Sequence, residues 1–230
     1  MAEGDAKADW PQLSDIIPHH DSDRPAGTAV LTGLSSALHL DCPVTVEFGA
    51  QRVVWVENDV RTELEYQAFS LGRGLYLVDA MPPPPDRRSR TMIWDLGAMR
   101  ALIVEAAFAT QTDNSSAVRV RYRHGGIGSG TMMRYPRSTA LAERFMCYRG
   151  LGDFEECDVF DLRENLYLVS WREKLLPCVG IMVEDHERMR AVGKVCAVDA
   201  RTGVIANTRV GASISYGAAN FAARPAQQSS

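Results

Sequence analysis

Leu75-Tyr76-Leu77-Val78 recurs 91 residues later in the chain as Leu166-Tyr167-Leu168-Val169. A second pair of segments, residues 95–101 and 185–191, shares an Asp and a Met-Arg-Ala triplet at an offset of 90. Because the two matches agree in order and in spacing within one residue, they indicate an internal duplication. The period is too long for a solenoid, so each half is expected to form a small unit of its own.

Short segments of alternating apolar and polar residues occur in both halves, as in residues 44–48, 52–56 and 118–122. Turn residues separate these segments every 8–12 positions or so, which is typical of an antiparallel meander. A long antiparallel sheet has to close or stack to remove its edges. We therefore predict an all-β, internally duplicated antiparallel β-barrel, built either as two small barrels or as one combined barrel.

The ends of the chain differ in composition from its middle. Residues 1–26 are rich in Asp, Pro, His and Ala, and the last residues are rich in Ala, Gln and Ser. Such segments cannot bury enough apolar surface to order themselves. We therefore divide the chain into a flexible leader (1–26), a first repeat (27–114), a second repeat (115–216) and a flexible tail (217–230).

The composition excludes several classes of protein. Of the 230 residues, 46% are hydrophobic and 23% are charged, which is typical of a globular protein. No stretch of about 18 apolar residues is present, and the acidic, polar N-terminus is unlike a secretory signal peptide. A net charge of -4, with arginines scattered among carboxylates, argues against nucleic-acid binding. We expect a cytoplasmic protein whose partner is a small molecule, without membrane or nucleic-acid contacts; the sequence leaves a homodimer open.

Metal and nucleotide sites are not indicated. The five cysteines include no CxxC pair and the five histidines show no ligand spacing, so buried thiols and no metal are expected. The sequence contains no GxGxxG or GxxxxGK[ST] phosphate loop and no GxSxG elbow. We therefore expect no cofactor and no serine-hydrolase chemistry.

The strand at residues 166–173 carries the candidate acid. Alternation places Tyr167, Trp171 and Glu173 on one face, and Leu168 and Ser170 on the other. If the aromatic face lines a barrel lumen, Glu173 lies at its rim, where burial raises its pKa and suits it to proton transfer. The alternative is that Glu173 pairs with a surface cation as the strand ends.

Other residues of the second half suit substrate binding. Arg149 ends an apolar strand that includes Phe145 and Tyr148, and its guanidinium is suited to hold a carboxylate. The alternative is a surface arginine in a turn. Tyr135 is expected either to orient a ligand or to cover the barrel end. Met182, on the next strand of the meander, is expected to contact a ligand.

The first half lacks the candidate acid. At the offset of 91, Trp171 is matched by Ala80 and Glu173 by Pro82, so duplication followed by loss puts function mainly in the second half. Four aromatic or acidic residues of the first half are expected either to line a second pocket or to pack in the core: Trp55, Glu65, Tyr66 and Trp94.

The sequence resembles the MoaF family, which is named for molybdenum cofactor biosynthesis. Residues 166–180 resemble the C-terminal domain of that family, and Trp-Arg-Glu-Lys-x-x-Pro-Cys is the most specific stretch. The resemblance spans about residues 27–216 and implies a calycin fold, meaning lipocalin-type barrels. Further matches are Met189-Arg190, Gly193-Lys194 and 210–212 in the second half, and 53–55, 65–66, 74–79 and 93–96 for the N-terminal domain.

The second half is similar, more distantly, to the phenolic acid decarboxylases, which are cofactor-free lyases with a lipocalin-like barrel. These enzymes use a lumenal Glu, an Arg and paired tyrosines. By position in the motif, Glu173 and Arg149 match the Glu and the Arg, and Tyr135 matches one tyrosine. The second tyrosine is not evident, and residues 138–140 lack the His of a Glu-His pair that MoaF domains tend to carry.

These observations predict cofactor-free acid–base chemistry on a small aromatic or anionic metabolite. Glu173 would transfer the proton, Arg149 would hold an anionic group, and Tyr135 and Trp171 would orient the ring, with Phe145, Tyr148, Tyr167 and Met182 as further contacts. Lyase, isomerase and cyclase reactions all suit such a site. The alternatives are a carrier or sensor that does no chemistry and a structural partner protein with a filled lumen.

Overall fold

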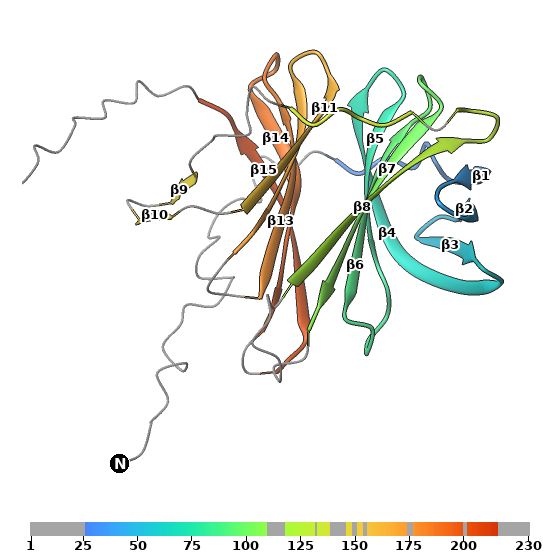
Figure 1. The fold of residues 1–230 in the computed structure, drawn as a ribbon, viewed down its shortest axis with the longest axis horizontal. Helices are drawn as coiled ribbons and strands as arrows, with labels where there is room; N and C mark the ends of the chain where they lie inside the picture. The colour runs from blue at the N-terminus through green and yellow to red at the C-terminus, as the bar shows by residue number, and fades with distance from the viewer. Residues whose placement is uncertain are drawn as a thin grey trace, which may run out of the picture.

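The computed structural model describes residues 26–109, 118–131, 133–138, 146–148, 151–153, 156–173, 177–199 and 202–215. Side chains are described for all of these except residues 146–148, 151–153 and 156. Every regular element in these ranges is a β-strand (Figure 1). No helix that could cross a membrane is found among them.

The first eight strands form a closed antiparallel barrel in which each strand pairs with the next. The barrel closes where Leu38 and His39 pair with Ile127 and Gly126. The predicted all-β antiparallel barrel is therefore confirmed. The strands are β1 (Ser35–His39), β2 (Pro43–Phe48), β3 (Arg52–Glu57), β4 (Val60–Gly72), β5 (Leu75–Met81), β6 (Arg88–Asp95), β7 (Arg100–Phe108) and β8 (Val118–Ile127).

The second half forms a five-stranded antiparallel sheet, and among the described residues it does not close into a second barrel or join the first. Strand β8 lies beyond the predicted boundary at residue 114, yet it completes the first barrel. A separate pair of short strands, β9 (Met146–Tyr148) and β10 (Leu151–Asp153), precedes the sheet. The strands of the sheet are β11 (Glu156–Arg163), β12 (Leu166–Arg172), β13 (Cys178–Asp185), β14 (Arg190–Val198) and β15 (Ile205–Ser213).

The duplication is visible in the backbone. Strands β4 to β8 follow the same order as β11 to β15, and β4 and β11 carry register shifts 91 residues apart, at Ser70/Gly72 and Asp161/Arg163. The following turns place Arg73 and Asn165 in the left-handed region, with φ of 50° and 55°. Met99 and Met189 repeat this in the next turns, again with φ of 50° and 55°. The two repeats therefore share the turn geometry of their hairpins.

The barrel lumen is filled by apolar side chains through most of its length. Residues alternate along each strand, so Met92 and Trp94 of β6 face inward while Ile93 faces outward. The phenyl ring of Phe48 packs edge-on against Trp94, with ring centres 5.3 Å apart. The middle of this lumen is a packed core, and only its end is available for a ligand.

The outer wall of the barrel packs against one face of the second sheet, which lies beside it in Figure 1. Leucine, valine and isoleucine side chains dominate both surfaces, and most are completely buried. This contact forms the larger core of the protein and leaves the other face of the second sheet turned away from the barrel. It includes Leu75, Leu77, Ile93, Leu102 and Val104 of the barrel, and Phe160, Leu168, Val179, Ile181 and Val183 of the sheet.

A buried ion pair joins the two layers. The Lys194 ammonium donates to Asp79 Oδ1 at 2.6 Å, and the two side chains are 2% and 3% exposed. Arg209 Nε donates to Asp79 Oδ2 at 2.6 Å. Burial alone raises the pKa of Asp79, but the charges of Lys194 and Arg209 outweigh it and hold that pKa below its usual value. Asp79 is therefore ionised inside the seam.

Removal of one partner of this pair should destabilise the fold. Lys194→Met leaves the buried Asp79 carboxylate with Arg209 and the Asn207 amide as its partners. We expect the free energy of unfolding to fall by about 3 kcal/mol in urea titrations. Arg188→Ala, which breaks an exposed pair with Asp185, is the control and should cost at most about 1 kcal/mol. Equal effects of the two substitutions would contradict a structural role for the buried pair.

Candidate functional site

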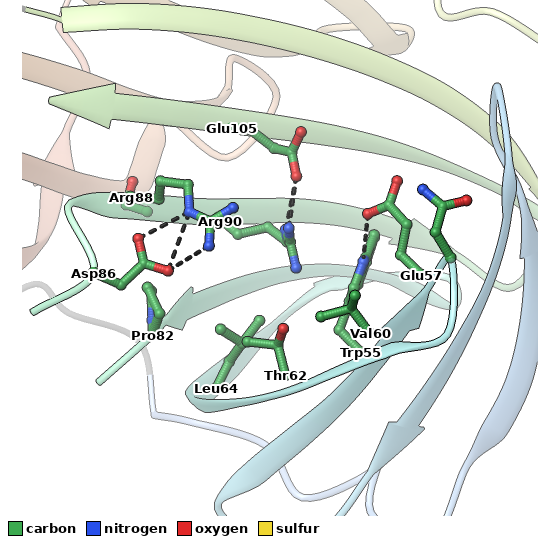
Figure 2. Close-up of a pocket in the computed structure, with 12 residues that line it drawn as sticks. Trp55, Glu57, Val60, Thr62, Leu64, Pro82, Asp86, Arg88, Arg90 and Glu105 are labelled. Carbon is green, nitrogen blue, oxygen red and sulfur yellow. Dashed lines mark hydrogen bonds and ion pairs between the residues drawn. The ribbon is translucent and has the colours of Figure 1, made fainter. Parts of the chain in front are cut away.

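A cavity of about 240 Å³ opens at one end of the barrel. A cavity of about 150 Å³ holds benzene, so this one has room for a ring with one or two substituents. We call it the barrel mouth (Figure 2). Its lining residues are Trp55, Glu57, Asn58, Val60, Thr62, Leu64, Pro82, Asp86, Arg88, Ser89, Arg90 and Glu105.

Strand alternation brings the charged residues of the mouth together. Arg88 and Arg90 share the lumen face of β6 with Met92, but they lie nearer the start of the strand, at the open end. The neighbouring strand places Glu105 directly opposite Arg90. On β8, Arg123 pairs with Ile103, which also faces the lumen. The alternation that fills the core with apolar side chains therefore also places charged side chains at the open end of the barrel.

The Arg90 guanidinium lies over the Trp55 indole, with its central carbon 4.0 Å from the ring centre. Its Nε and Nη2 donate to Glu105 Oε1 at 3.0 and 2.7 Å. Nη1 makes no hydrogen bond with any described residue. The side chain is only 13% exposed, and this burial lowers the pKa of Arg90, although an arginine stays charged. Arg90 therefore presents to the cavity the Nη1 edge of a guanidinium that is largely shielded from water.

Glu57 is held as a carboxylate. It accepts hydrogen bonds from Trp55 Nε1 at 2.9 Å and from the Cys42 thiol at 3.0 Å, and Arg123 Nη2 lies 2.7 Å away. Burial alone raises the pKa of Glu57, but the hydrogen bonds from Arg123, Cys42 and Trp55 outweigh it and hold that pKa at about 2. The same carboxylate raises the pKa of the Cys42 thiol. Glu57 is therefore an acceptor at neutral pH and not a proton donor.

Arg123 links the carboxylates beneath the mouth. Its side chain is 4% exposed and pairs with Asp41 and Glu57, with Glu105 Oε2 3.9 Å from its Nη1. Burial opposes the charge of Arg123, but the hydrogen bonds to Glu57 and Asp41 outweigh it and raise the pKa of the guanidinium. Arg123 is therefore a positioning residue that fixes the acceptors.

The predicted residues of β12 share one face of the second sheet, turned away from the barrel. Trp171 Nε1 donates to Glu173 Oε1 at 3.2 Å. The Trp171 ring covers Gly180 so closely that a Cβ there would lie 2.0 Å from it. Met182 covers Gly193 on the same face, and the Tyr167 ring contacts His186 with centres 5.1 Å apart. The structure thus brings Tyr167, Trp171, Glu173 and Met182 to one surface, which we call the open face.

Tyr135 lies elsewhere. It is buried in the seam between the layers, where its hydroxyl donates to Asp95 Oδ2 at 3.4 Å and the Arg100 guanidinium covers its ring. Burial raises the pKa of Tyr135. The structure does not bring Tyr135 together with Glu173. Arg149 and Phe145 lie outside the described residues, as does the side chain of Tyr148, so their roles stay predictions.

Sequence reasoning missed the charged residues of the mouth. Of the four first-half residues considered, Trp55 lines the mouth and Trp94 packs in the lumen core. Glu65 and Tyr66 line a second cavity, of about 540 Å³. A signal was present, because Trp55-Val56-Glu57 repeats the Trp-x-Glu pattern of residues 171–173 with the same indole-to-carboxylate bond. No group of His, Cys, Asp and Glu suited to a metal occurs in the described part of the chain.

The Glu57 pKa has a consequence for acid stability. Because its folded value of about 2 lies below the usual 4.5, ionised Glu57 stabilises the fold above pH 4.5 and loses that effect toward pH 2. We expect Glu57→Gln to lower the free energy of unfolding at pH 7 by on the order of 3 kcal/mol. Urea titrations at several pH values should show this gap closing from about pH 5 downward. A gap that stays constant would contradict the assignment.

Comparisons with known proteins agree with this architecture. The model of the MoaF N-terminal domain matches residues 8–110, and that of the MoaF C-terminal domain matches residues 146–219. The protein MoaF of Klebsiella aerogenes is 37% identical over 65 residues, which are 28% of this chain and 25% of that protein. The chain thus spans about a quarter of the length of that relative. Since the two family models together cover most of the sequence, the chain belongs to the MoaF family.

Proposed function

We propose that this MoaF-family protein binds a small organic molecule bearing an anionic group in the barrel mouth. The observation that carries the proposal is the cavity of about 240 Å³ in which a mostly buried Arg90 lies over Trp55. Its Nη1 donates to no acceptor among the described residues. A desolvated guanidinium gains strongly from a carboxylate or phosphate oxygen.

Apolar side chains complete the proposed site. Val60, Leu64 and Pro82 line the wall across from the charged strands (Figure 2). Small-molecule sites typically combine such a wall with a few fixed polar groups. The hydrogen bonds donated by the thiols of Cys42 and Cys196 suit a reducing compartment such as the cytoplasm.

The ionised state of Glu57 favours a carrier or sensor over an acid catalyst at this site, because a carboxylate with a pKa of about 2 donates no proton near neutrality. A second candidate is a cofactor-free lyase, isomerase or cyclase at the open face. It is supported by the Trp171–Glu173 hydrogen bond, which orients a carboxylate beside an indole.

Arg90→Lys tests the proposed site, because lysine keeps the charge beside Glu105 but loses the flat, bidentate guanidinium. In a thermal-shift screen of organic carboxylates and phosphates, a ligand at 100 times its Kd should add about 2.7 kcal/mol to wild-type stability. The variant should bind at least about tenfold more weakly. Arg188→Lys, at an exposed pair in the turn after β13, is the control. Equal binding to all three proteins would place the ligand elsewhere.

Glu173→Gln separates the two candidates. An acid catalyst at the open face should lose turnover by about 10²-fold or more, whereas a carrier should show only a modest change in affinity. Products of the incubated ligand are measured by mass spectrometry. Full turnover by the variant would exclude Glu173 as the acid.

A further inference from the structure

We infer that the ligand of the barrel mouth is a zwitterion, with an ammonium group near Glu57 and a carboxylate near Arg88 and Arg90. The inference rests on the proposed function and specifies its ligand class. It follows from the charge balance of the mouth, from the separation of its charges, and from the hydrogen-bonding capacity that the protein leaves unused.

The charges of the mouth cancel. Ion pairs connect Arg90, Glu105 and Glu57 with Asp41, Arg121 and Arg123 behind them, and a separate pair joins Arg88 to Asp86. The set contains four arginines and four carboxylates, so its net charge is zero: Arg88, Arg90, Arg121 and Arg123 against Asp41, Glu57, Asp86 and Glu105. A ligand of zero net charge is the electrostatic match to such a site.

The hydrogen-bonding edges that these ion pairs leave free are nevertheless separated along the cavity. In Figure 2, Arg88 and Asp86 lie at one end of the cavity and Glu57 lies at the other, beside Trp55. Arg90 and Glu105 lie between them. A ligand that extends along the cavity therefore meets the Arg88–Asp86 and Arg90–Glu105 pairs first and the Glu57 carboxylate at the other end.

Both ends have unused capacity. At the arginine end, Asp86 takes Nε and Nη2 of Arg88 and Glu105 takes the same atoms of Arg90, so each Nη1 has no described acceptor. At the other end, Glu57 Oε2 accepts only the Trp55 indole hydrogen among the described residues. A carboxylate oxygen has two lone pairs, so it can take a further donor.

Simple ions fit less well. A purely anionic ligand would bring its charge toward ionised Glu57 and Glu105, and like charges in a poorly hydrated site repel strongly. A purely cationic ligand would leave the open edges of Arg88 and Arg90 without an acceptor. Only a ligand that carries both charges satisfies both ends of the cavity.

Three probes of nearly equal size test the inference. The probe 4-(aminomethyl)benzoate carries both charges, 4-methylbenzoate carries only the carboxylate, and benzylamine carries only the ammonium. Isothermal titration calorimetry with wild type should give at least about tenfold tighter binding of the first probe than of either other, because each charged hydrogen bond adds that much.

Variants assign the two ends. Glu57→Gln should weaken 4-(aminomethyl)benzoate about tenfold. It should strengthen 4-methylbenzoate, because it removes a like charge from the cavity. Arg88→Gln, at an exposed side chain, should weaken both carboxylates and spare benzylamine. This second variant keeps the test decisive if Glu57→Gln fails to fold. Arg188→Gln, at an exposed pair in the turn after β13, is the matched control and should leave all three affinities unchanged.

Equal affinity for 4-methylbenzoate and 4-(aminomethyl)benzoate, or no binding of any probe, would overturn the zwitterion inference. Neither result would by itself overturn the proposed function, which depends on the wider screen with Arg90→Lys. If the compounds found in that screen bind Arg90→Lys more weakly than wild type, the proposed site is retained. If the zwitterionic probe is at the same time not preferred, the zwitterion is rejected as the ligand class.

Discussion

The second sheet buries the outer wall of strands β5 to β8, and this contact determines how both faces of those strands are used. The outward residues of these strands form the seam with β12 to β14, so they are apolar or, like Asp79, paired with a buried cation. The inward residues form the lumen core and, at its end, the mouth. A charged residue on a strand that is buried on both faces needs an ion-pair partner. Asp79 has such partners, and so does Arg123.

The duplicated halves use equivalent positions differently. At the offset of 90, Arg90 and Glu105 of the mouth correspond to Gly180 and Val195 of the second sheet. Gly180 leaves room for the Trp171 ring, which covers it. One repeat therefore carries an ion-lined cavity where the other carries an apolar surface. This asymmetry is why we assign ligand binding to the first barrel, although the sequence had directed attention to the second half.

Much of the fold could be predicted because it depends on local patterns. The repeat at residues 75–78 and 166–169 marks matching strands, and alternation assigns Trp171 and Leu168 to opposite faces correctly. The pairing of β8 with β1 could not be predicted, because register between residues about 90 positions apart leaves no local signal. The site was missed for the same reason. Whether Arg90 faces a lumen depends on barrel closure, and Tyr135 is buried by a seam that no motif indicates.

The most direct test of the account is to locate a bound ligand by the indole N–H signals of the four tryptophans. Each signal is assigned in a ¹⁵N-correlated NMR spectrum by a Trp→Phe substitution, and the most stabilising compound of the thermal screen is then titrated. The account predicts that the Trp55 signal shifts with ligand concentration while the Trp171 signal stays in place. A shift of Trp171 without a shift of Trp55 would contradict it and would assign the site to the open face.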